Sequence, residues 1–293
     1  MASPELDSSA ISHIGPVREE NQDAIRLPDT RLPPETGQLY AVADGMGGYA
    51  NGALASRLAL EALFDTVYEN NAASIQAALR HGVERANLQV YKAAQNLESG
   101  RMGTTLTAGC ITGNTLHIAH VGDSRLYLVR NAASTVLTND HTTVGDLVRM
   151  KVLTPEKIRK HAQRSILTKG VGLTMIVKPD ITQVNLQEND CLILCSDGLW
   201  SVIEDVEFAQ LAGANHSAEH LGQSLIDLAL ERETDDNISV IAIYVRQLAA
   251  NPHGNHNGHG SGHGPGWARS LANFLPEKVN SILGRNGRNG RQH

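Results

Sequence analysis

Three aspartates in this chain stand at the edges of apolar runs, beside small or amide residues. Asp44 lies in ADGMGG, Asp197 in SDGLW and Asp236 in TDDNISV. A carboxylate at a strand end can reach a cleft while its strand stays buried, and a neighbouring glycine lets backbone carbonyls approach a ligand. Converging carboxylates repel one another unless hard divalent cations neutralise them. The pattern therefore predicts an oxygen-only site suited to Mg²⁺ or Mn²⁺.

Each of these Asp-Gly pairs also has an ordinary interpretation. Taken singly, such a pair is typical of a tight turn and implies no chemistry. Three acidic motifs at three strand ends are poorly explained by turns alone, and together they favour one shared site.

The elements that must position these aspartates are a mixture of strands and helices. Apolar runs that end in turn residues indicate strands, and Ala and Leu at helical spacing indicate helices. Gly113-Asn114 and Gly122-Asp123-Ser124 are expected to form hairpin turns. Because strands cluster and helices come in adjacent pairs, the sequence predicts an α+β layered sandwich. The expected strands are 38–43, 104–111, 115–121, 126–130, 191–195 and 238–245, and the expected helices are 53–68, 74–96, 206–211 and 218–231.

Six short motifs follow one another between about residues 11 and 245. They are RxxNQD at 18–23, DGMGG at 44–48, MGTT at 102–105, VGDSR at 121–125, CSDGLW at 195–200 and DDNISV at 235–240. This ordered series resembles that of the type 2C (PPM) metal-dependent protein phosphatases, particularly the bacterial ones. The resemblance implies a four-layer α-β-β-α sandwich of two mainly antiparallel sheets flanked by helices. It also implies hydrolysis of phosphoserine and phosphothreonine on proteins by a metal-bridging hydroxide, reversing a bacterial serine/threonine kinase.

The same resemblance implies roles for individual residues around two metal ions. Asp44 would bridge the two ions, with the Gly45 carbonyl on one of them and Asp197 and Asp236 on the other. Asp23 would hold a metal-bound water or touch the metal directly.

Two further residues complete the site that the resemblance implies. Arg18 would grip the phosphoryl oxygens as a planar bidentate donor, and its alternative is a surface salt bridge. Asp123 would join Asp197 at a third metal ion, and its alternative is a plain turn residue. The expected cofactors are thus two or three Mn²⁺ or Mg²⁺ ions, and the expected catalytic set is Arg18, Asp44, Asp197 and Asp236.

Two positions depart from the family pattern. Many relatives have Glu-Asp where this chain has Gln22-Asp23, so one negative charge is missing near the second metal and we expect weaker or Mn²⁺-favouring binding. Eukaryotic relatives carry a histidine, a candidate general acid, where this chain has Met46. A thioether cannot donate a proton. The leaving-group proton must therefore come from metal-bound water or from another residue.

Composition argues against several other classes of function. The 293 residues carry a formal net charge of −6, which gives the main domain no global attraction to nucleic acid. The three cysteines form an odd set, and CSDGLW lacks the CxxxxxR loop of cysteine phosphatases, so Cys195 is expected to be strand core. Neither a disulfide framework, nor a secretion signal, nor a membrane span is indicated, and a cytoplasmic location is expected.

The chain is expected to comprise a phosphatase domain at 8–246, a His/Gly-rich flexible linker at 247–266, and an amphipathic and basic tail at 267–293. The tail has three alternatives: an interfacial membrane anchor, a docking peptide for a partner kinase, or disorder. Residues 140–172 are rich in basic residues and match the mobile flap of the family, although a solvated helical surface is an equal alternative. A monomer acting on phosphorylated proteins, including a serine/threonine kinase and its substrates, is expected.

Two other functions compete with that of an active enzyme. A catalytically dead phosphopeptide-binding relative would have lost Asp44, Asp197 or Asp236, and none is lost. A module of a sigma-factor partner-switching system usually carries an additional sensor domain, for which this chain has no room.

Overall fold

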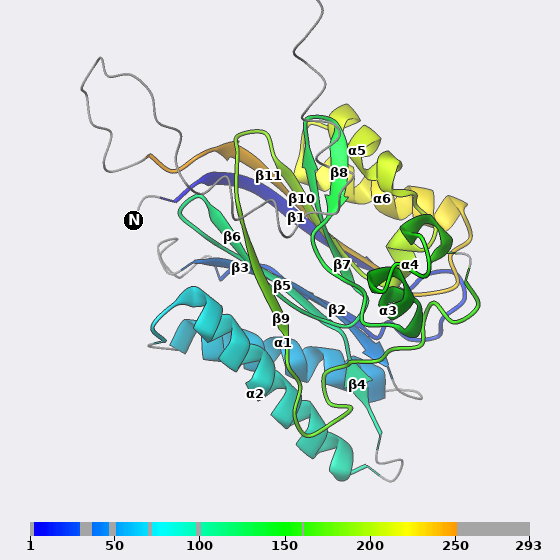
Figure 1. The fold of residues 1–293 in the computed structure, drawn as a ribbon. Coiled ribbons are helices and arrows are strands. Elements are labelled where there is room, and N and C mark those ends of the chain that lie inside the picture. Colours follow the sequence, from blue (N-terminus) through cyan, green and yellow to red (C-terminus); the bar gives the residue numbers. More distant parts are fainter. Residues whose placement is uncertain are drawn as a thin grey trace, which may run out of the picture. The chain divides into compact units, whose positions relative to one another are not determined.

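A computed structural model describes residues 3–29, 37–46, 51–69, 72–97, 101–159 and 161–250 (Figure 1). The predicted tail at 267–293, and the predicted linker from residue 251 onward, lie outside the described residues. No helix in the described part of the chain is long and apolar enough to cross a membrane.

Two antiparallel sheets form the centre of the fold. The first has the strand order β1-β11-β10-β7-β8, and the second has the order β2-β3-β5-β6-β9, with β4 paired to the end of β3. The strands of the first sheet are β1 (Glu5–His13), β7 (Arg125–Arg130), β8 (Ala133–Val136), β10 (Cys191–Cys195) and β11 (Ile238–Gln247). Those of the second are β2 (Asp23–Arg26), β3 (Gln38–Met46), β4 (Gly103–Thr104), β5 (Leu106–Thr112), β6 (Thr115–Val121) and β9 (Asp180–Asn185).

Helices cover the outer face of each sheet. Figure 1 shows α1 and α2 against the second sheet and α5 and α6 against the first. Two short helices, α3 and α4, lie near the ends of the strands. The bounds are α1 (Asn51–Glu69), α2 (Ile75–Gln95), α3 (Thr143–Arg149), α4 (Asp197–Trp200), α5 (Asp205–Ala214) and α6 (Ala218–Glu231), with a short 3₁₀ turn at Pro155–Lys157.

Three apolar cores separate the four layers, and strand alternation explains them. On β3, Leu39 and Ala41 pack against α1 and α2, whereas Tyr40 and Val42 face the core between the sheets. Because successive side chains of a strand point to opposite faces, a run buried on both faces reads as continuously apolar. The predicted α-β-β-α sandwich is confirmed. Cys195 is buried strand core and, like the other two cysteines, forms no disulfide.

One of the two predicted hairpin turns is wrong. Gly113-Asn114 does connect the paired strands β5 and β6. Gly122-Asp123-Ser124 instead carries the chain from β6 in the second sheet to β7 in the first, because β6 pairs with β5 and β9 while β7 pairs with β10 and β8. Asp123 therefore lies where the chain crosses between the two sheets.

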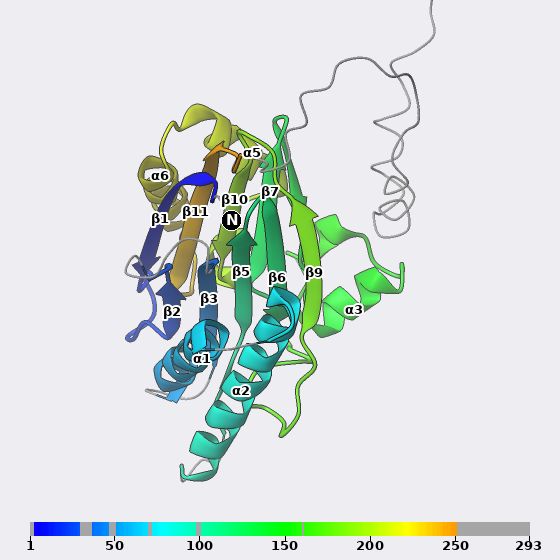
Figure 2. The same cartoon turned by 90° about the vertical axis from the view of Figure 1, so that its left-hand side faces the viewer.

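Several strands were not predicted from the sequence. Among them β1 has the sequence ELDSSAISH, β2 has only four residues, and β9 is half exposed. The pairing of β1 with β11 runs from Glu5 opposite Gln247 to His13 opposite Ile238. Figure 2 shows the two strands side by side. The expected domain start at residue 8 thus falls inside β1.

Candidate active site

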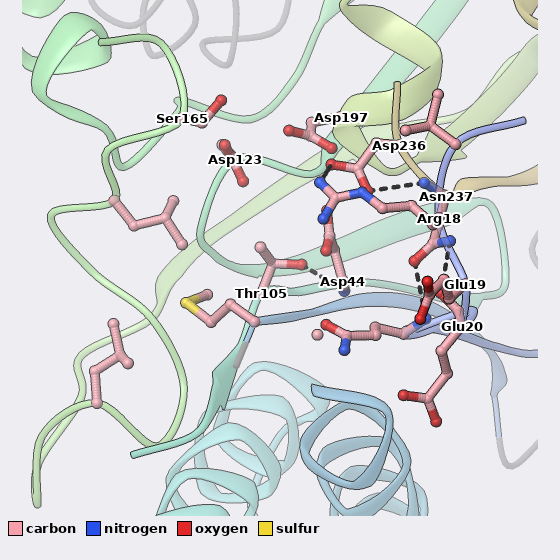
Figure 3. Close-up of a pocket in the computed structure, with 16 residues that line it drawn as sticks. Arg18, Glu19, Glu20, Asp44, Thr105, Asp123, Ser165, Asp197, Asp236 and Asn237 are labelled. Carbon is pink, nitrogen blue, oxygen red and sulfur yellow. Dashed lines mark hydrogen bonds and ion pairs between the residues drawn. The ribbon is translucent and has the colours of Figure 1, made fainter. Parts of the chain in front are cut away.

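A cleft of about 1000 Å³ opens at one end of the two sheets (Figure 3). The strands β3 and β10 and the turn after β6 deliver carboxylates into it, and the segment before β2 supplies a cation. The charged and polar residues that line the cleft are Arg18, Glu19, Glu20, Gln22, Asp44, Thr105, Asp123, Ser165, Asp197, Asp236 and Asn237. Of the residues predicted to form the site, all but Asp23 line this cleft.

Asp44 is held by its backbone at the end of β3. Its amide donates to Thr105 Oγ1 at 2.9 Å, and its carbonyl accepts from the Thr105 amide and the Thr104 hydroxyl, each at 2.9 Å. The MGTT motif therefore fixes the strand end that presents the carboxylate. Hydrogen bonds of this kind fix the orientation of a metal-binding residue, and their loss weakens metal binding or activity by about 10- to 100-fold.

Gly45 occupies a position that no larger residue can take. A Cβ added there would lie 2.1 Å from the Gly52 carbonyl oxygen and 2.6 Å from that of Gln22. The Gly45 amide also donates to the Gln22 carbonyl at 3.1 Å. Glycine thus lets the end of β3, the start of α1 and the segment before β2 meet backbone to backbone.

Asp197 and Asp236 reach the cleft from the SDGLW and TDDNISV motifs, which are hydrogen-bonded to each other. Asp197 opens α4 directly after β10, and the Thr234 hydroxyl donates to the Gly198 carbonyl at 2.9 Å. A Cβ on Gly198 would lie 2.1 Å from the Asn237 carbonyl oxygen. Asp197 Oδ1 is buried and has no hydrogen-bond partner among the described residues.

Asn237 joins this pair of motifs to the segment that contains Arg18. Its side-chain amide donates to the carbonyls of Ile14 and Glu20, at 2.7 and 3.0 Å, and its Oδ1 accepts from the Gln22 amide at 2.9 Å. Asn237 was not predicted to take part in the site, although the DDNISV motif contains it. Its position explains why an amide, with both donors and an acceptor, follows the aspartate.

Arg18 lies in the cleft and is paired with one of its carboxylates. Its Nη2 is 2.7 Å from Asp236 Oδ2, and its Nε donates to the Asp235 carbonyl at 3.1 Å. The side chain is 51% exposed. The ion pair that the sequence analysis kept as an alternative does exist, but its partner is a carboxylate of the candidate site.

Asp23 lies behind the cleft wall and directly opposite Asp44 in the pairing of β2 with β3. The Ser196 hydroxyl donates to Asp23 Oδ2 at 2.7 Å and itself accepts from the Ser239 amide at 3.0 Å. Any contact of Asp23 with a cleft ligand is therefore made from the second layer of side chains.

Asp123 is buried, and its backbone is fixed on both sides. Gly122 before it has a φ of +112°, and a Cβ there would lie 2.6 Å from Thr105 Cβ. The Trp200 indole donates to the Asp123 carbonyl at 2.9 Å. The Arg125 guanidinium, 3.7 Å from the Trp200 ring, supports that indole while it holds Asp140 at 2.7 Å.

The environment of the cleft disfavours the ionised form of the aspartates in and behind it. Burial raises the pKa of Asp44 well above its usual range, and the charges of the other four site aspartates raise it further. Burial likewise raises the pKa of Asp123 well above its usual range, that of Asp23 to about 7 and that of Asp197 to about 6. Negative charge that is both desolvated and self-repelling attracts a cation.

The donor set fits Mg²⁺ or Mn²⁺, which prefer oxygen ligands. The partnerless Asp197 Oδ1 and the tightly packed Gly45 are the observations of this structure that support the fit. Within the described ranges, no three acidic, histidine or cysteine side chains are grouped closely enough to hold an ion by themselves. Backbone carbonyls and water must therefore complete the ligand shell.

The flap segment, defined here as residues 140–172, supplies part of the cleft that sequence reasoning did not resolve to single residues. Ser165 and Leu167 line the cleft, and Arg164 lowers the pKa of Asp197 slightly, against the larger effects of burial and Asp236. The basic composition of this segment was the only signal that it approaches the site. Glu19 and Glu20 were missed because the RxxNQD motif leaves both positions unspecified.

Comparisons with known proteins give one consistent result. The family model described as protein phosphatase 2C matches residues 13–229. The serine/threonine phosphatase stp of Listeria welshimeri is 31% identical over 234 residues, which span 78% of this chain and 92% of that protein. The S. agalactiae serine/threonine phosphatase structure has a TM-score of 0.76 at 33% identity, covering 83% of this chain and 100% of that one. The catalytic domain of the phosphatase PstP in complex with two manganese ions has a TM-score of 0.71 at 31% identity, covering 83% and 99%.

Proposed function

The chain belongs to the protein phosphatase 2C family, and from this premise we propose that it is a metal-dependent protein serine/threonine phosphatase. The observation that carries the proposal is the convergence of Asp44, Asp123, Asp197 and Asp236 on one cleft beside Arg18. A cation site next to a guanidinium is suited to a phosphoryl group, whose oxygens both can neutralise.

The residues that would hold the metal ions are Asp44, the Gly45 carbonyl, Asp197 and Asp236, with Asp23 behind them. Two Mn²⁺ or Mg²⁺ ions held there, the number of manganese ions in the PstP complex, would activate water for attack at neutral pH and would neutralise charge that develops on the phosphoryl group. A third ion between Asp123 and Asp197 is the further arrangement that we propose.

Arg18 binds and orients the phosphoryl group in this proposal. Its Nε and Nη2 already engage Asp235 and Asp236, which holds the guanidinium plane at the cleft. In the described part of the chain Nη1 has no partner, so it is available to phosphoryl oxygens. A planar donor fixed in this way loses little conformational entropy when the substrate binds.

The departing serine or threonine oxygen needs a proton, and Met46 cannot donate one. Met46 lines the cleft, and its thioether has no hydrogen to give. Asp123 lies in the same cleft. We therefore propose that the proton reaches the leaving oxygen at the part of the cleft that Asp123 lines. General acid catalysis of this kind accelerates a reaction by about 10²- to 10⁴-fold.

The proposed cellular setting follows from the relatives and from the cysteines. The proposed partners are phosphorylated proteins, among them a serine/threonine kinase and its substrates, because relatives are named as serine/threonine phosphatases. The protein is proposed to act as a monomer. Three buried free cysteines suit a cytoplasmic location. The domain limits 8–246, 247–266 and 267–293 also remain a proposal.

The proposed function is tested by phosphate release from phosphoserine and phosphothreonine peptides with Mn²⁺, Mg²⁺, Ca²⁺ or EDTA. Turnover is expected with Mn²⁺ or Mg²⁺, and Asp44→Ala and Asp236→Ala should abolish it in a folded protein. Asp227→Ala is the matched control, because Asp227 is an exposed α6 residue bonded to Gln223. Full turnover in EDTA would refute the proposal, and peptide binding without turnover would favour the catalytically dead relative.

A further inference from the structure

His141 is a fully buried histidine at the start of the flap segment, and the mechanism above does not use it. It contacts the Gly122-Asp123 turn twice. The His141 amide donates to the Gly122 carbonyl at 2.7 Å, and the Gly122 amide donates to His141 Nδ1 at 3.1 Å. Both backbone polar groups of Gly122, the residue immediately before Asp123, are therefore bound by His141.

The other contacts of His141 reach two more parts of the fold. Its carbonyl accepts from the Thr168 amide at 2.8 Å, so it joins the beginning of the flap segment to the end. Its Nε2 lies 3.2 Å from Asp180 Oδ2 at the first residue of β9. Its ring stacks on that of His120, with centroids 4.8 Å apart. One residue, through its backbone and its side chain, thus connects the Asp123 turn, the end of the flap segment and the edge of the second sheet.

These contacts select one tautomer of the ring. Nδ1 must carry a lone pair, because it accepts from the Gly122 N–H. The hydrogen then resides on Nε2, where the Asp180 carboxylate accepts it at 3.2 Å. Lys169 Nζ also lies 3.4 Å from Nε2, but in this tautomer it donates to Asp180 and not to the ring. Lys169 Nζ lies 3.4 Å from Asp180 Oδ1, and this positive charge adds to the effect of the His141 bond in holding the pKa of Asp180 below its usual range.

The position of Gly122 gives this arrangement its importance. A backbone with φ of +112° packed against Thr105 cannot shift without moving the Asp123 carboxylate that follows it. Trp200 holds the carbonyl of Asp123 on the other side. Replacing the His141 side chain would remove the acceptor for the Gly122 amide, while the backbone bond from residue 141 to the Gly122 carbonyl and the Trp200 bond would remain.

We propose that His141, as the neutral Nε2–H tautomer fixed by Asp180, is a positioning residue that sets the Asp123 turn and couples it to the flap segment. The proposal rests on the proposed function, in which Asp123 assists departure of the serine or threonine oxygen. It also ties the position of the Asp123 turn to that of the flap segment, because residue 141 bonds both Gly122 and Thr168.

Two substitutions separate the two halves of this role. In His141→Asn, the side-chain Oδ1 can replace Nδ1 as the acceptor for Gly122, while the link to Asp180 is lost. In His141→Gln, the side-chain amide can replace Nε2 towards Asp180, while the Gly122 acceptor is lost. His117→Gln is the matched control, because His117 lies on β6, bonds Thr112 at 3.1 Å and does not line the cleft.

At saturating Mn²⁺, His141→Gln should lower kcat for a phosphothreonine peptide about tenfold or more, whereas His141→Asn should stay within about threefold of the wild type. Both should hydrolyse p-nitrophenyl phosphate within about threefold of the wild type, since that leaving group needs no proton. His141→Gln combined with Asp123→Ala should be no slower than Asp123→Ala alone, because residues acting through one group are not additive. Equal loss on both substrates, or additive losses, would overturn the proposal.

A second measurement is independent of activity. ¹⁵N spectra of histidine-labelled protein should show His141 with hydrogen on Nε2 and an unprotonated Nδ1, and the Gly122 amide should exchange slowly in the wild type and in His141→Asn. An Nδ1–H tautomer, or a Gly122 amide that exchanges freely in the wild type, would overturn the clamp. If the wild type hydrolyses no phosphopeptide, the proposed function fails. The spectra would still show whether His141 Nδ1 accepts the Gly122 hydrogen bond. Should His141→Gln fail to fold, loss of peptide turnover in His141→Asn as large as in Asp123→Ala would sink the proposal.

Discussion

Arg18 shows how one residue can be bound to the site and still serve the substrate. Arg18→Ala should raise KM for a phosphothreonine peptide about tenfold or more, because it removes a charged hydrogen-bond donor. Arg18→Lys should recover only part of the loss, since an ammonium lacks the planar fork. Steady-state kinetics together with Mn²⁺ titration calorimetry check this, with metal affinity expected to change little.

A matched control for Arg18 is Arg232→Ala. Arg232 makes a bidentate pair with Glu207 outside the cleft, at 2.7 Å for each bond. An unaltered kinetic profile in Arg18→Ala, or an equal loss in Arg232→Ala, would remove Arg18 from substrate binding.

Asp44 illustrates a conflict between stability and function at a single residue. Asp44→Asn keeps the shape of the side chain but removes a charge that burial and four neighbouring aspartates disfavour. The metal-free variant should melt about 3–6 °C above the metal-free wild type, while turnover falls more than about a hundredfold. Calorimetry in EDTA and phosphate release in Mn²⁺ give the two readouts. A variant that melts lower would mean that the carboxylate stabilises the metal-free fold.

At the scale of elements, the end of β3 and the start of α1 meet in a tightly packed backbone contact beside the site. A Cβ on Gly52 would lie 2.2 Å from Gln22 Oε1 and 2.9 Å from the Gly45 carbonyl. Gly52→Ala should therefore cost about 1–3 kcal/mol in the free energy of unfolding and weaken Mn²⁺ binding.

Gly213→Ala is the counterpart within another helix. Gly213 lies in α5, and a Cβ there would meet nothing within 4 Å. This variant should be more stable than the wild type by about 0.5–1 kcal/mol, because alanine loses less conformational freedom in a helix. Urea unfolding of both variants makes the comparison. Similar changes in the two would contradict the close packing at Gly52.

The elements that sequence could predict were those buried on both faces or built from long amphipathic patterns. Strand β10 and helices α1 and α2 carry strong apolar signals, and their predicted positions are confirmed within a few residues. Strands β1 and β9 were missed because they are half exposed and polar, so their identity depends on a partner far away in the chain. The crossing at Gly122 was misread because a turn motif does not reveal which sheet receives the next strand.

The same limit applies to the site. The aspartates and Arg18 were identified from motifs, and the structure brings them together, although their chemical roles remain predictions. Asn237 and His141 act through neighbours that are distant in sequence, such as Glu20 and Asp180, and no local pattern reports such contacts.

At the scale of the whole molecule, the buried carboxylates should control how stability depends on pH. The pKa of Asp23 is raised to about 7 and that of Asp197 to about 6, against about 3.9 for an aspartate in an unfolded chain. The folded state therefore binds more protons than the unfolded state between about pH 4 and 7, and stability is lost as the pH rises through 6 to 7. The melting temperature of the metal-free protein should fall by about 5 °C or more from pH 5 to pH 8.

Saturating Mn²⁺ should flatten this dependence, because the cation replaces the protons. Asp197→Asn should flatten it in part without metal. A melting temperature of the metal-free wild type that rises over the same range would show that the carboxylates are already neutralised by other groups.

The pairing of β1 with β11 also sets the order of events during synthesis. Asp23 and Asp44 emerge early from the ribosome, whereas Asp236 and the strand that pairs with β1 emerge near the end of the described fold. At a synthesis rate of about 5–20 residues per second, Asp236 is made on the order of ten to forty seconds after Asp44. Until β11 has been made, β1 has no strand to pair with and the cleft lacks Asp236. Catalytic competence appears late in translation, so an interrupted chain cannot act as a phosphatase before it is complete through β11.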